Sequence, residues 1–448
     1  MHELTHNVDA SASSGYRNFR DPVHNIISLD TDTVEGALLN RLIDSSEVQR
    51  LRRIRQVGLA YFAYQGAEHS RFAHSIGTMH LSQRMLARIE RRVSLSRFEK
   101  MATMAAALLH DVGHGPFSHT IEPIARFRHE TWTISLLTDP TSSLNQILTE
   151  VDCDLPAAIV HILQGTFSKR FLCQVVSSQF DCDRLDYLLR DSLMTGVSYG
   201  HYDLEWLLSS LEVDPTANTL FIRAKGLHAI EEFIQSRNRM FRQLYFHHLI
   251  KAAEAVFSGA IERAVELFQA QNLGMDDTTG ILMNFLIGNP LTVEQYLSLD
   301  DVDILWHLKR WAFSPDPELS DLATRFSDRR MFKTLDIPPD MTDETVEQIL
   351  HHGQALVAGS PISPHRAVTV QLSRDIPYFR PGSGKHPILV ERGSGKSGLA
   401  DLIDVSEIVA SIQPVRLRRL WQADQHKVRC PPRRRDVARL PKQATSFR

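Results

Sequence analysis

Apolar residues recur at intervals of three and four positions along most of the chain between Leu38 and Ala270. This spacing gathers apolar side chains on one face of a helix, so it predicts a series of amphipathic helices. The stretches with this pattern are Leu38 to Ile54, Ile76 to Ile89, Met101 to Leu109, Val175 to Leu189 and Leu227 to Phe257. We therefore expect a mainly α fold.

Local signals refine this expectation. Ser96, followed three residues later by Glu99, is a capping-box pattern that predicts a helix start. The segment L-E-V-D-P-T-A-N-T-L-F-I-R-A, from Leu211, carries two apolar runs around an Asp-Pro and Asn turn and predicts a hairpin. The segment F-R-D-P-V-H-N-I-I-S-L-D, from Phe19, predicts a turn and a short strand where the folded part begins.

The length of the chain and the change in its residue pattern predict the domain organisation. A chain of 448 residues exceeds the size at which one hydrophobic core usually stops growing. Past Asn289 the pattern changes: a helical stretch is predicted from Thr292 to Trp311, followed by breaks at Pro315, Pro317, Pro338 and Pro339. We predict a flexible N-terminus over residues 1–18, a main helical domain over 19–290, a smaller α+β region over 291–415 and a basic, mobile tail over 416–448.

Charge, cysteine content and hydropathy limit the binding partners and the cellular compartment that we expect. The formal net charge is -3, which gives no overall attraction to nucleic acid or membrane. Eleven Lys and Arg against two Asp after residue 415 make the tail a local exception through which nucleic acid is a possible partner. The four cysteines form no C-x-x-C pair, the N-terminus lacks a signal-peptide pattern, and no apolar run approaches the roughly 20 residues of a membrane helix. We expect a soluble cytoplasmic protein without a membrane partner.

Two imidazoles and two carboxylates form a candidate metal site. Arg71 and His74 share the face of one helix near its start, and His110 and Asp111 close a strongly apolar helix before G-H-G-P-F-S-H. Asp183 lies on a third helix, in D-C-D-R-L-D-Y. Such polar groups at the end of an apolar helix are costly unless something ligates or pairs them. The mixed N/O set suits Mn, Fe, Zn or Mg and does not choose among them.

Simpler interpretations of the same residues exist. A lone His on an apolar face is usually a satisfied core residue, an H-D pair occurs by chance, and acidic residues along a helix are usually a solvated face. What favours a metal site is the co-occurrence of H, then H-D with G-H-G-P-F-S-H, then D within D-R-L-D-Y. An isolated motif would not carry the inference.

The order and spacing of these segments resemble the HD superfamily, and within it the deoxynucleoside triphosphate triphosphohydrolases, which include dGTPase-like enzymes and relatives that join a SAM domain to the HD domain. The likeness runs from Phe19 to Lys333 and includes I-D-S-S-E-V-Q-R-L-R, R-N-R-M-F-R-Q-L-Y-F-H-H and R-R-M-F-K. It implies an HD-domain helical fold and an enzyme that cleaves dNTPs to deoxynucleoside and inorganic triphosphate, with control of dNTP pools or defence against phage as its purpose. It also implies a homo-oligomer: a dimer, tetramer or hexamer.

The resemblance also assigns roles to residues. The family's metal ligands fall on His74, His110, Asp111 and Asp183. Its catalytic histidines match His119 and His129, with His114 and Glu122 at supporting positions. Its substrate contacts match Gln56, Arg71, Arg184, Tyr187, Asp191, Arg237 and Tyr245, while Phe241 stands where a relative has histidine. Its nucleotide-effector contacts match Asp44, Gln49, Arg52, Arg329 and Lys333.

The residues suit the reaction on chemical grounds. Cleavage requires attack at the α-phosphorus and protonation of the leaving 5′-oxygen, so we expect a divalent metal to activate water and His119 to act as the acid, with His129 as its partner. A second Mg on the substrate phosphates is a further expectation. Asp183, Tyr187 and Asp191 recur every four residues, as do Arg237, Phe241 and Tyr245, so each set is predicted to form one helical stripe. The alternative for Tyr187, Phe241 and Tyr245 is that they are core aromatics.

The resemblance implies regulation by a guanine nucleotide bound between subunits, although the identity of the activator stays open. The chemistry is compatible, because Asp44 suits the N1 and N2 donors of guanine and Arg52 suits its O6 edge. The alternative is that Q-R-L-R is a solvated helix face. Two rival functions remain open from the sequence: an HD phosphohydrolase acting on monophosphates, cyclic nucleotides or alarmones, and a nucleic-acid-binding or sensing protein that uses its basic tail.

Overall fold

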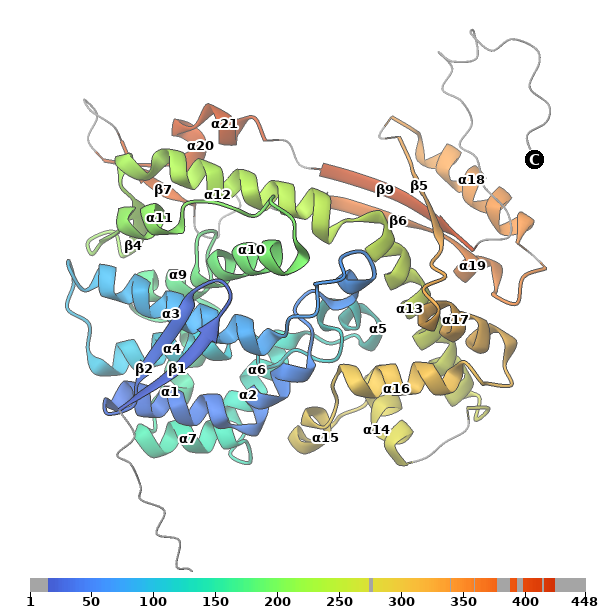
Figure 1. Cartoon of the computed structure of the whole chain (residues 1–448), viewed down its shortest axis with the longest axis horizontal. Helices are drawn as coiled ribbons and strands as arrows, with labels where there is room; N and C mark the ends of the chain where they lie inside the picture. The colour runs from blue at the N-terminus through green and yellow to red at the C-terminus, as the bar shows by residue number, and fades with distance from the viewer. Residues whose placement is uncertain are drawn as a thin grey trace, which may run out of the picture. The chain divides into compact units, whose positions relative to one another are not determined.

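The computed structural model describes residues 15–273, 277–338, 340–357, 359–376, 387–392, 398–412 and 415–423. Helices predominate among them and the strands are short, which confirms the mainly α prediction (Figure 1). The described residues divide into two compact units. The first takes its residues from 1–247, 265–307 and 377–413, and the second from 248–264, 308–376 and 414–448. No helix of the described residues is long and apolar enough to cross a membrane.

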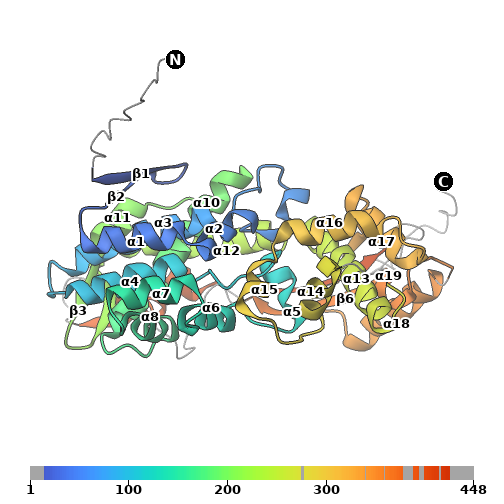
Figure 2. The ribbon, with the colours of Figure 1, turned by 90° about the horizontal axis from the view of Figure 1, so that it is seen from below.

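The first unit opens with the hairpin of β1 (Tyr16–Asp21) and β2 (Asn25–Asp30), which lies beside α1 (Figure 2). Its helices are α1 (Val34–Asp44), α2 (Ser46–Arg50), α3 (Arg71–Ile89), α4 (Arg97–Leu109), α5 (Glu122–Ala125), α6 (His129–Thr138), α7 (Ser143–Val151), α8 (Leu155–Gln164), α9 (Arg170–Val176), α10 (Cys182–Thr195), α11 (Leu204–Ser210), α12 (Leu227–Met240), α14 (Asp277–Leu286), α15 (Val293–Leu297), α20 (Leu402–Val405) and α21 (Glu407–Ala410). Its short turns are η1 (Leu51–Arg53), η2 (Gly58–Phe62), η3 (Ser118–Thr120), η4 (Ala224–Gly226) and the π turn η5 (Phe241–Tyr245).

Helix α4 forms the centre of this unit. Ser96 and Glu99 make the predicted capping box at its start, and its buried run from Met101 to Leu109 packs against α3, α8 and α1. The helix ends at Leu109, so His110 is its C-cap and Asp111 begins the following loop. The core therefore delivers the H-D pair to one fixed position at the helix end.

Two of the predicted helices are interrupted. Ser45 adopts an extended conformation, ends α1 and caps α2 through its hydroxyl, so Leu38 to Ile54 is not one helix. Residues 177–181 separate α9 from α10, where Asp181 caps the second helix. Apolar spacing runs across both breaks because the flanking helices bury their faces in the same core, whereas the capping side chains set the boundaries.

Gly77 allows α3 and α10 to approach closely. A β-carbon built on Gly77 would lie 1.9 Å from Asp186 Oδ1 and 2.5 Å from Arg190 Nη2, both on α10. Only a residue without a side chain fits there. The contact brings the first turn of α3 and the first turn of α10, which carry His74 and Asp183, to the same place.

The predicted hairpin is present as β3 (Leu211–Asp214) and β4 (Thr219–Ile222), and it extends into a four-stranded sheet. Strand β7 (Leu389–Glu391) pairs parallel with β4, and β8 (Leu399–Asp401) pairs antiparallel with β7. Residues 387–392 and 398–412 therefore belong to the first unit, not to the predicted C-terminal region of 291–415. The predicted domains were continuous stretches of sequence, so they could not include this pairing, which joins strands more than 160 residues apart.

The second unit has the expected α+β character. Its three-stranded antiparallel sheet has the order β5-β9-β6, with β5 (Lys333–Asp336), β6 (Val368–Ile376) and β9 (Val415–Gln422). Its helices are α17 (Pro317–Ser327), α18 (Asp343–Leu356) and α19 (Pro364–Ala367), and α13 (His248–Gln269) and α16 (Asp301–Trp311) each contribute residues to both units.

The predicted tail begins too early. Residues 416–422 lie in β9, in which Leu420 and Trp421 are buried. The count of positive charges obscured this apolar pair. Adjacent residues of a strand point to opposite faces of the sheet, so Leu420 and Trp421 are buried one on each face. Residues 424–448 of the predicted tail, like residues 1–14 of the predicted flexible N-terminus, lie outside the described residues.

Candidate metal centre and active site

The four predicted metal ligands converge from three helices of the first unit. His74 lies in the first turn of α3, His110 and Asp111 at the end of α4, and Asp183 in the first turn of α10. His74 Nε2 lies 3.2 Å from Asp183 Oδ1 and 3.8 Å from Asp111 Oδ2, while His110 Nε2 lies 3.3 Å from Asp111 Oδ1 and 3.7 Å from Asp183 Oδ1. Ligand atoms bonded to one ion at about 2.1 Å are separated by roughly 3 to 3.5 Å.

The tautomers of both imidazoles suit metal binding. His74 Nδ1 lies 2.8 Å from Asp186 Oδ2, and His110 Nδ1 lies 2.8 Å from the Ala107 carbonyl oxygen, so each Nδ1 is the donor. The Nε2 atoms of both rings are buried and have no hydrogen-bond partner. Both Nε2 atoms face the carboxylates, so each can exchange its proton for a cation bound among them.

The electrostatics of the site also call for a cation. Burial alone would lower the pKa of His74, but hydrogen bonds and charge from Asp183 and Asp186 raise it to about 10. Burial alone would raise the pKa of Asp183, but His110 and His74 hold it far below its usual range. Without a metal these groups must share protons to balance their charges. The residues present therefore fit a divalent ion, and the N₂O₂ donor set does not distinguish Mn, Fe, Zn and Mg.

Asp186 anchors this centre, and the sequence analysis did not single it out. It is fully buried, and besides His74 it contacts His24 Nε2 at 2.8 Å and Arg190 Nε at 2.7 Å. Arg190 in turn donates to Asp21 Oδ2 at 2.8 Å. Asp186 stands three residues after Asp183 in D-R-L-D, so its spacing on one helical face could have indicated it.

Arg71 connects the metal ligands to the following loop. Its guanidinium forms a buried ion pair with Asp111 and donates to Ser118 Oγ at 2.7 Å and to the Gln56 carbonyl at 3.5 Å. Burial would raise the pKa of Asp111, but Arg71 together with His110 and His114 outweighs it and keeps the carboxyl ionised, as a ligand must be. The side-chain oxygen of Gln56 is buried and has no hydrogen-bond partner, so it remains available to a bound molecule.

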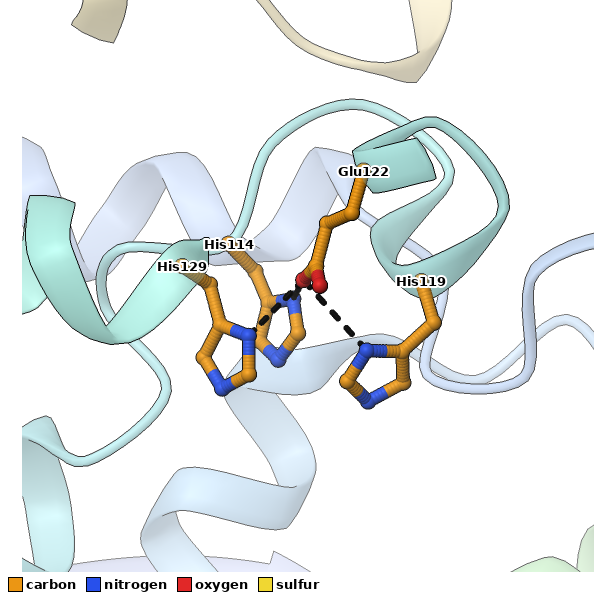
Figure 3. Close-up of side chains that lie close together, drawn as sticks. All are labelled: His114, His119, Glu122 and His129. Atoms are coloured by element: carbon orange, nitrogen blue, oxygen red, sulfur yellow. Dashed lines mark hydrogen bonds and ion pairs between the residues drawn. The ribbon is translucent and has the colours of Figure 1, made fainter. Parts of the chain in front are cut away.

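The predicted catalytic group forms a second cluster beside the ligands (Figure 3). His129 Nδ1 lies 2.7 Å, His119 Nδ1 3.3 Å and His114 Nδ1 3.6 Å from Glu122 Oε1. The rings of His114 and His129 are stacked at 3.7 Å, and His114 Nε2 lies 3.4 Å from Asp111 Oδ1. His119 is 69% exposed, whereas His114 is buried. The cluster can therefore pass protons between solvent and the metal ligands.

The loop that carries these histidines is fixed by a distant residue. Asp301 Oδ1 accepts from the Phe117 main-chain N–H at 2.7 Å, and Oδ2 accepts from that of Arg55 at 3.0 Å. Phe117 has φ +53° and so occupies the left-handed region, which a buried acceptor helps to hold. Gly113 lets α6 approach, since a β-carbon there would lie 2.2 Å from the Thr133 nitrogen.

Two guanidiniums of the first unit, half-buried Arg184 and buried Arg237, are without full pairing. Arg184 is held by Asp181 on one side, but its Nε has no hydrogen-bond partner, and its Nη1 lies 3.9 Å from Asp183 Oδ2. Arg237 is 5% exposed, and neither its Nε nor its Nη1 has a partner. Burial and the charge of Arg184 lower the pKa of Arg237, although Tyr187 opposes them. Unpaired buried guanidiniums favour the arrival of an anion.

A polar and aromatic wall completes the site. Tyr245 donates its hydroxyl hydrogen to Asp191 Oδ2 at 2.7 Å, and His69 Nε2 lies 2.7 Å from Asp191 Oδ1. The ring of Tyr245 meets those of Tyr187 and Phe241 edge-on, with centroids 6.2 Å and 5.1 Å apart. Phe241 begins the π turn η5, so the second predicted stripe does not follow α-helical geometry to Tyr245. His69 is a further member that the sequence analysis missed.

The predicted effector residues are only partly brought together. Gln49 Oε1 accepts from Arg52 Nε at 2.8 Å, and the guanidinium of Arg52 covers the ring of Phe72 at 3.6 Å. Asp44, at the end of α1, is 54% exposed and pairs with Arg17 at 2.7 Å. Arg329 and Lys333 belong to the second unit.

Comparisons with known proteins agree with this geometry. The HD domain family matches residues 71–150, and the HD-associated region matches residues 202–285. The uncharacterized protein YwfO of Bacillus subtilis is 34% identical over 399 residues, which cover 88% of this chain and 88% of that protein. The chain belongs to the HD-domain family. All four predicted metal ligands of this HD-domain protein lie in or between the two matched regions.

Two further similar proteins are described as hydrolases. The deoxynucleoside triphosphate triphosphohydrolase SAMHD1 of Gallus gallus is 28% identical over 290 residues, and this HD-domain chain covers 46% of its length, or about half. The crystal structure of a phosphohydrolase from Bacteroides thetaiotaomicron is similar with a TM-score of 0.78 at 28% identity, covering 91% of this chain and 99% of that one. HD-domain proteins of this kind are metal-dependent phosphohydrolases, which supports a hydrolase here.

Proposed function

We propose that this protein is a metal-dependent dNTP triphosphohydrolase, which releases a deoxynucleoside and inorganic triphosphate. The observation that carries the proposal is a pair of incompletely hydrogen-bonded guanidiniums: half-buried Arg184, beside the metal ligand Asp183, and buried Arg237. A monophosphate needs few fixed cations, whereas a triphosphate needs several. The guanidinium fork binds phosphate oxygens bidentately. Arg71, paired with Asp111, places a third guanidinium at the metal ligands.

The reaction can be assigned to groups of this chain. A bound divalent ion would supply an activated water and polarise the α-phosphoryl oxygen. His119, exposed and joined to Glu122, is positioned to protonate the leaving 5′-oxygen. Glu122 keeps a low pKa because its bonds to His119 and His129 outweigh burial, so it remains an anion that stabilises a protonated imidazole. His129 exchanges protons through the same carboxylate.

The side chains around Asp191 would recognise the sugar. Its two oxygens already accept from His69 and Tyr245, which fixes the carboxylate so that a remaining lone pair can accept from a 3′-hydroxyl. Tyr187 stands on the same helix one turn before Asp191 and offers a ring face to the deoxyribose. A 2′-hydroxyl would compete for this packed space, so ribonucleotides should be poorer substrates.

A substrate panel tests the proposal. Metal-loaded protein is incubated with each dNTP, each NTP, a nucleoside monophosphate, a cyclic nucleotide, an alarmone and single-stranded DNA, singly and in pairs, and the products are separated by anion exchange. Release of inorganic triphosphate from dNTPs is the expected result. Release of phosphate from a monophosphate or cyclic nucleotide alone would replace the proposal with another HD phosphohydrolase. Binding of DNA without any hydrolysis would favour a sensing protein.

Matched substitutions on α12 test the role of the unpaired guanidinium. Arg237→Met should raise KM for the dNTP at least about tenfold, because one charge-assisted contact to phosphate contributes about 1.5 to 3 kcal/mol. Arg239→Met is the control, since Arg239 is exposed and bonds only to Gln235 among the described hydrogen bonds. Equal kinetics in the two variants would remove Arg237 from substrate binding.

Regulation and assembly form part of the same proposal. A guanine nucleotide held by Asp44, Gln49 and Arg52, with phosphate contacts from Arg329 and Lys333, would activate the enzyme within a homo-oligomer. The exposure of Asp44 supports this, because its carboxylate can exchange Arg17 for another donor. Light scattering with and without GTP gives the assembly state. An unchanged mass and an unchanged rate would exclude this form of regulation.

A further inference from the structure

The cluster of His114, His119, Glu122 and His129 has the composition of a second metal site. Three imidazole Nδ1 atoms surround Glu122 Oε1 at 2.7 to 3.6 Å (Figure 3). One ligand atom from each of the four residues lies within 4.8 Å of every other. Four ligands at about 2.0 to 2.1 Å from one ion in a tetrahedron are separated by roughly 3.4 Å. To reach that spacing, the Glu122 carboxylate would have to move away from His129 Nδ1, which lies 2.7 Å from it, and the exposed His119 side chain would have to turn.

A buried polar atom in this cluster lacks a partner. His114 is 1% exposed, and its Nδ1 has no hydrogen bond, because Glu122 Oε1 is bonded to His129 instead. On the other side of the ring, His114 Nε2 lies 3.4 Å from Asp111 Oδ1 and can donate a proton to it. That bond would leave the Nδ1 lone pair directed at Glu122. A carboxylate behind a ligating imidazole is a common support of metal sites.

From this geometry we infer that His114, His119, Glu122 and His129 form an inhibitory binding site for a transition-metal cation such as Zn²⁺, separate from the HD centre. The N₃O donor set favours Zn²⁺, Ni²⁺ and Cu²⁺ over Mg²⁺ and Mn²⁺, which prefer oxygen ligands. The HD centre, with two carboxylates, discriminates less among these ions. Exposed His119 gives the ion a route from solvent.

The consequence for catalysis rests on the proposed function. A bound ion would occupy Nδ1 of His119 and His129 together with Glu122, and so it would block the exchange of protons among them. Hydrolysis should then fall by about 10², the usual contribution of general acid–base groups. Excess Mg²⁺ should not restore it, because Mg²⁺ competes poorly for imidazole nitrogen.

The decisive experiment counts metal ions and does not depend on any substrate. Chelator-treated parent protein is equilibrated with Zn²⁺ or Co²⁺, freed of loose ions, and analysed by elemental analysis and Co²⁺ absorption. The parent should hold two ions per chain, and His119→Gln and Glu122→Gln should each hold one. Asp183→Asn should lose the HD-centre ion and keep the other. His161→Gln, which changes an exposed histidine, should keep both.

Each outcome of this experiment decides the inference. One ion per chain in the parent, or two in both His119→Gln and Glu122→Gln, would overturn it. A second arm titrates Zn²⁺ into Mn²⁺-loaded parent protein while dNTP hydrolysis is followed. Loss of activity as the second equivalent binds supports an inhibitory role, and full activity with two ions bound would reject it. If no dNTP is cleaved at all, the proposed function fails while the ion count still tests the site.

Discussion

The guanidinium of Arg50 donates a hydrogen bond to the main-chain carbonyl of His114 at 2.8 Å, which joins helix α2 to the loop of the candidate catalytic histidines. Arg50 is 1% exposed, and it also donates to the Leu299 carbonyl at 2.9 Å and stacks over Tyr296. Tyr296 bonds the carbonyl of Gly113 at 2.6 Å. Arg50 stands between the predicted effector residues Gln49 and Arg52, so movement of α2 would reach His114 directly.

Substitution of Arg50 tests this link. Arg50→Met should lower kcat about tenfold or more with KM and metal content unchanged, because a displaced His114 misaligns its neighbours and not the phosphate site. The two carbonyls left without a donor should also lower the free energy of unfolding by at least about 1 kcal/mol. Arg41→Met, at an exposed pair on α1, is the control. A change in KM alone would assign Arg50 to substrate binding instead.

The metal ligands give a prediction with two readouts. Asp111→Asn and His74→Ala should each lose the HD-centre ion and hydrolysis together, since either change removes a donor from the four-ligand set. Asp154→Asn, at an exposed carboxylate, should retain both. Elemental analysis and turnover on the same preparations check the prediction, and full occupancy of the HD centre in the first two variants would contradict the assignment.

Removal of the proposed acid should separate chemistry from binding. His119→Ala is expected to keep the HD-centre ion and dNTP affinity but to lose about 10² or more in turnover, because only the protonation of the leaving group is removed. Because the His119 side chain is exposed, its removal should not unfold the protein, so a folding defect would not explain the loss of turnover. His161→Ala serves as the control. Turnover near that of the parent would exclude His119 from the mechanism.

Asp301 should make stability depend on pH. Burial raises the pKa of its carboxyl to about 6, although hydrogen bonds from Phe117 and Arg55 oppose the shift. The folded state therefore binds more protons than the unfolded state between pH 4 and 6, so the free energy of unfolding falls as pH rises through this window. The contribution is about 3 kcal/mol at roughly 1.4 kcal/mol per pKa unit.

Asp301→Asn removes this dependence. Chemical denaturation at pH 4, 5, 6 and 7, with metal content held constant, should show the free energy of the parent falling relative to that of the variant. The difference should level off above pH 7, because Asp301 is then ionised in both states. Parallel curves for the two proteins would mean that Phe117 and Arg55 keep the carboxyl ionised throughout.

Asp44→Ala tests the regulatory proposal. The variant should lose the advantage of GTP in dNTP hydrolysis while it keeps its HD-centre ion and its basal rate, because Asp44 lies on α1 away from the ligands. A tenfold activation requires only about 1.4 kcal/mol of differential binding. Glu150→Ala, at another exposed carboxylate, is the control. A response to GTP equal to that of the parent would place any effector site elsewhere.

Local sequence patterns were enough to predict the helical character of the chain and the residues of the candidate centre. Apolar spacing and the Ser96 capping box predicted α4 with its end at the H-D pair, because these signals are local and repeat every turn. Motif order likewise predicted His74 and Asp183 as partners of that pair. Local patterns also gave two wrong boundaries. The apolar spacing continued past Ser45, which ends α1 and caps α2, and the tail was predicted to begin at Arg416, which lies within strand β9.

The residues that support the candidate centre became evident from the packed fold and not from local patterns. Asp186 and Arg50 lie inside quoted segments, but no local pattern assigned them a supporting role. That role, like those of His69 and Asp301, comes from partners 64 to 184 residues away in the chain. Likewise, β7 pairs with β4 through Val390 and Ile222, which lie more than 160 residues apart in the chain. Such contacts form because buried polar groups must find hydrogen-bond partners once the helices have packed. The partners are far apart in the chain, so the pairing follows no repeat in the sequence.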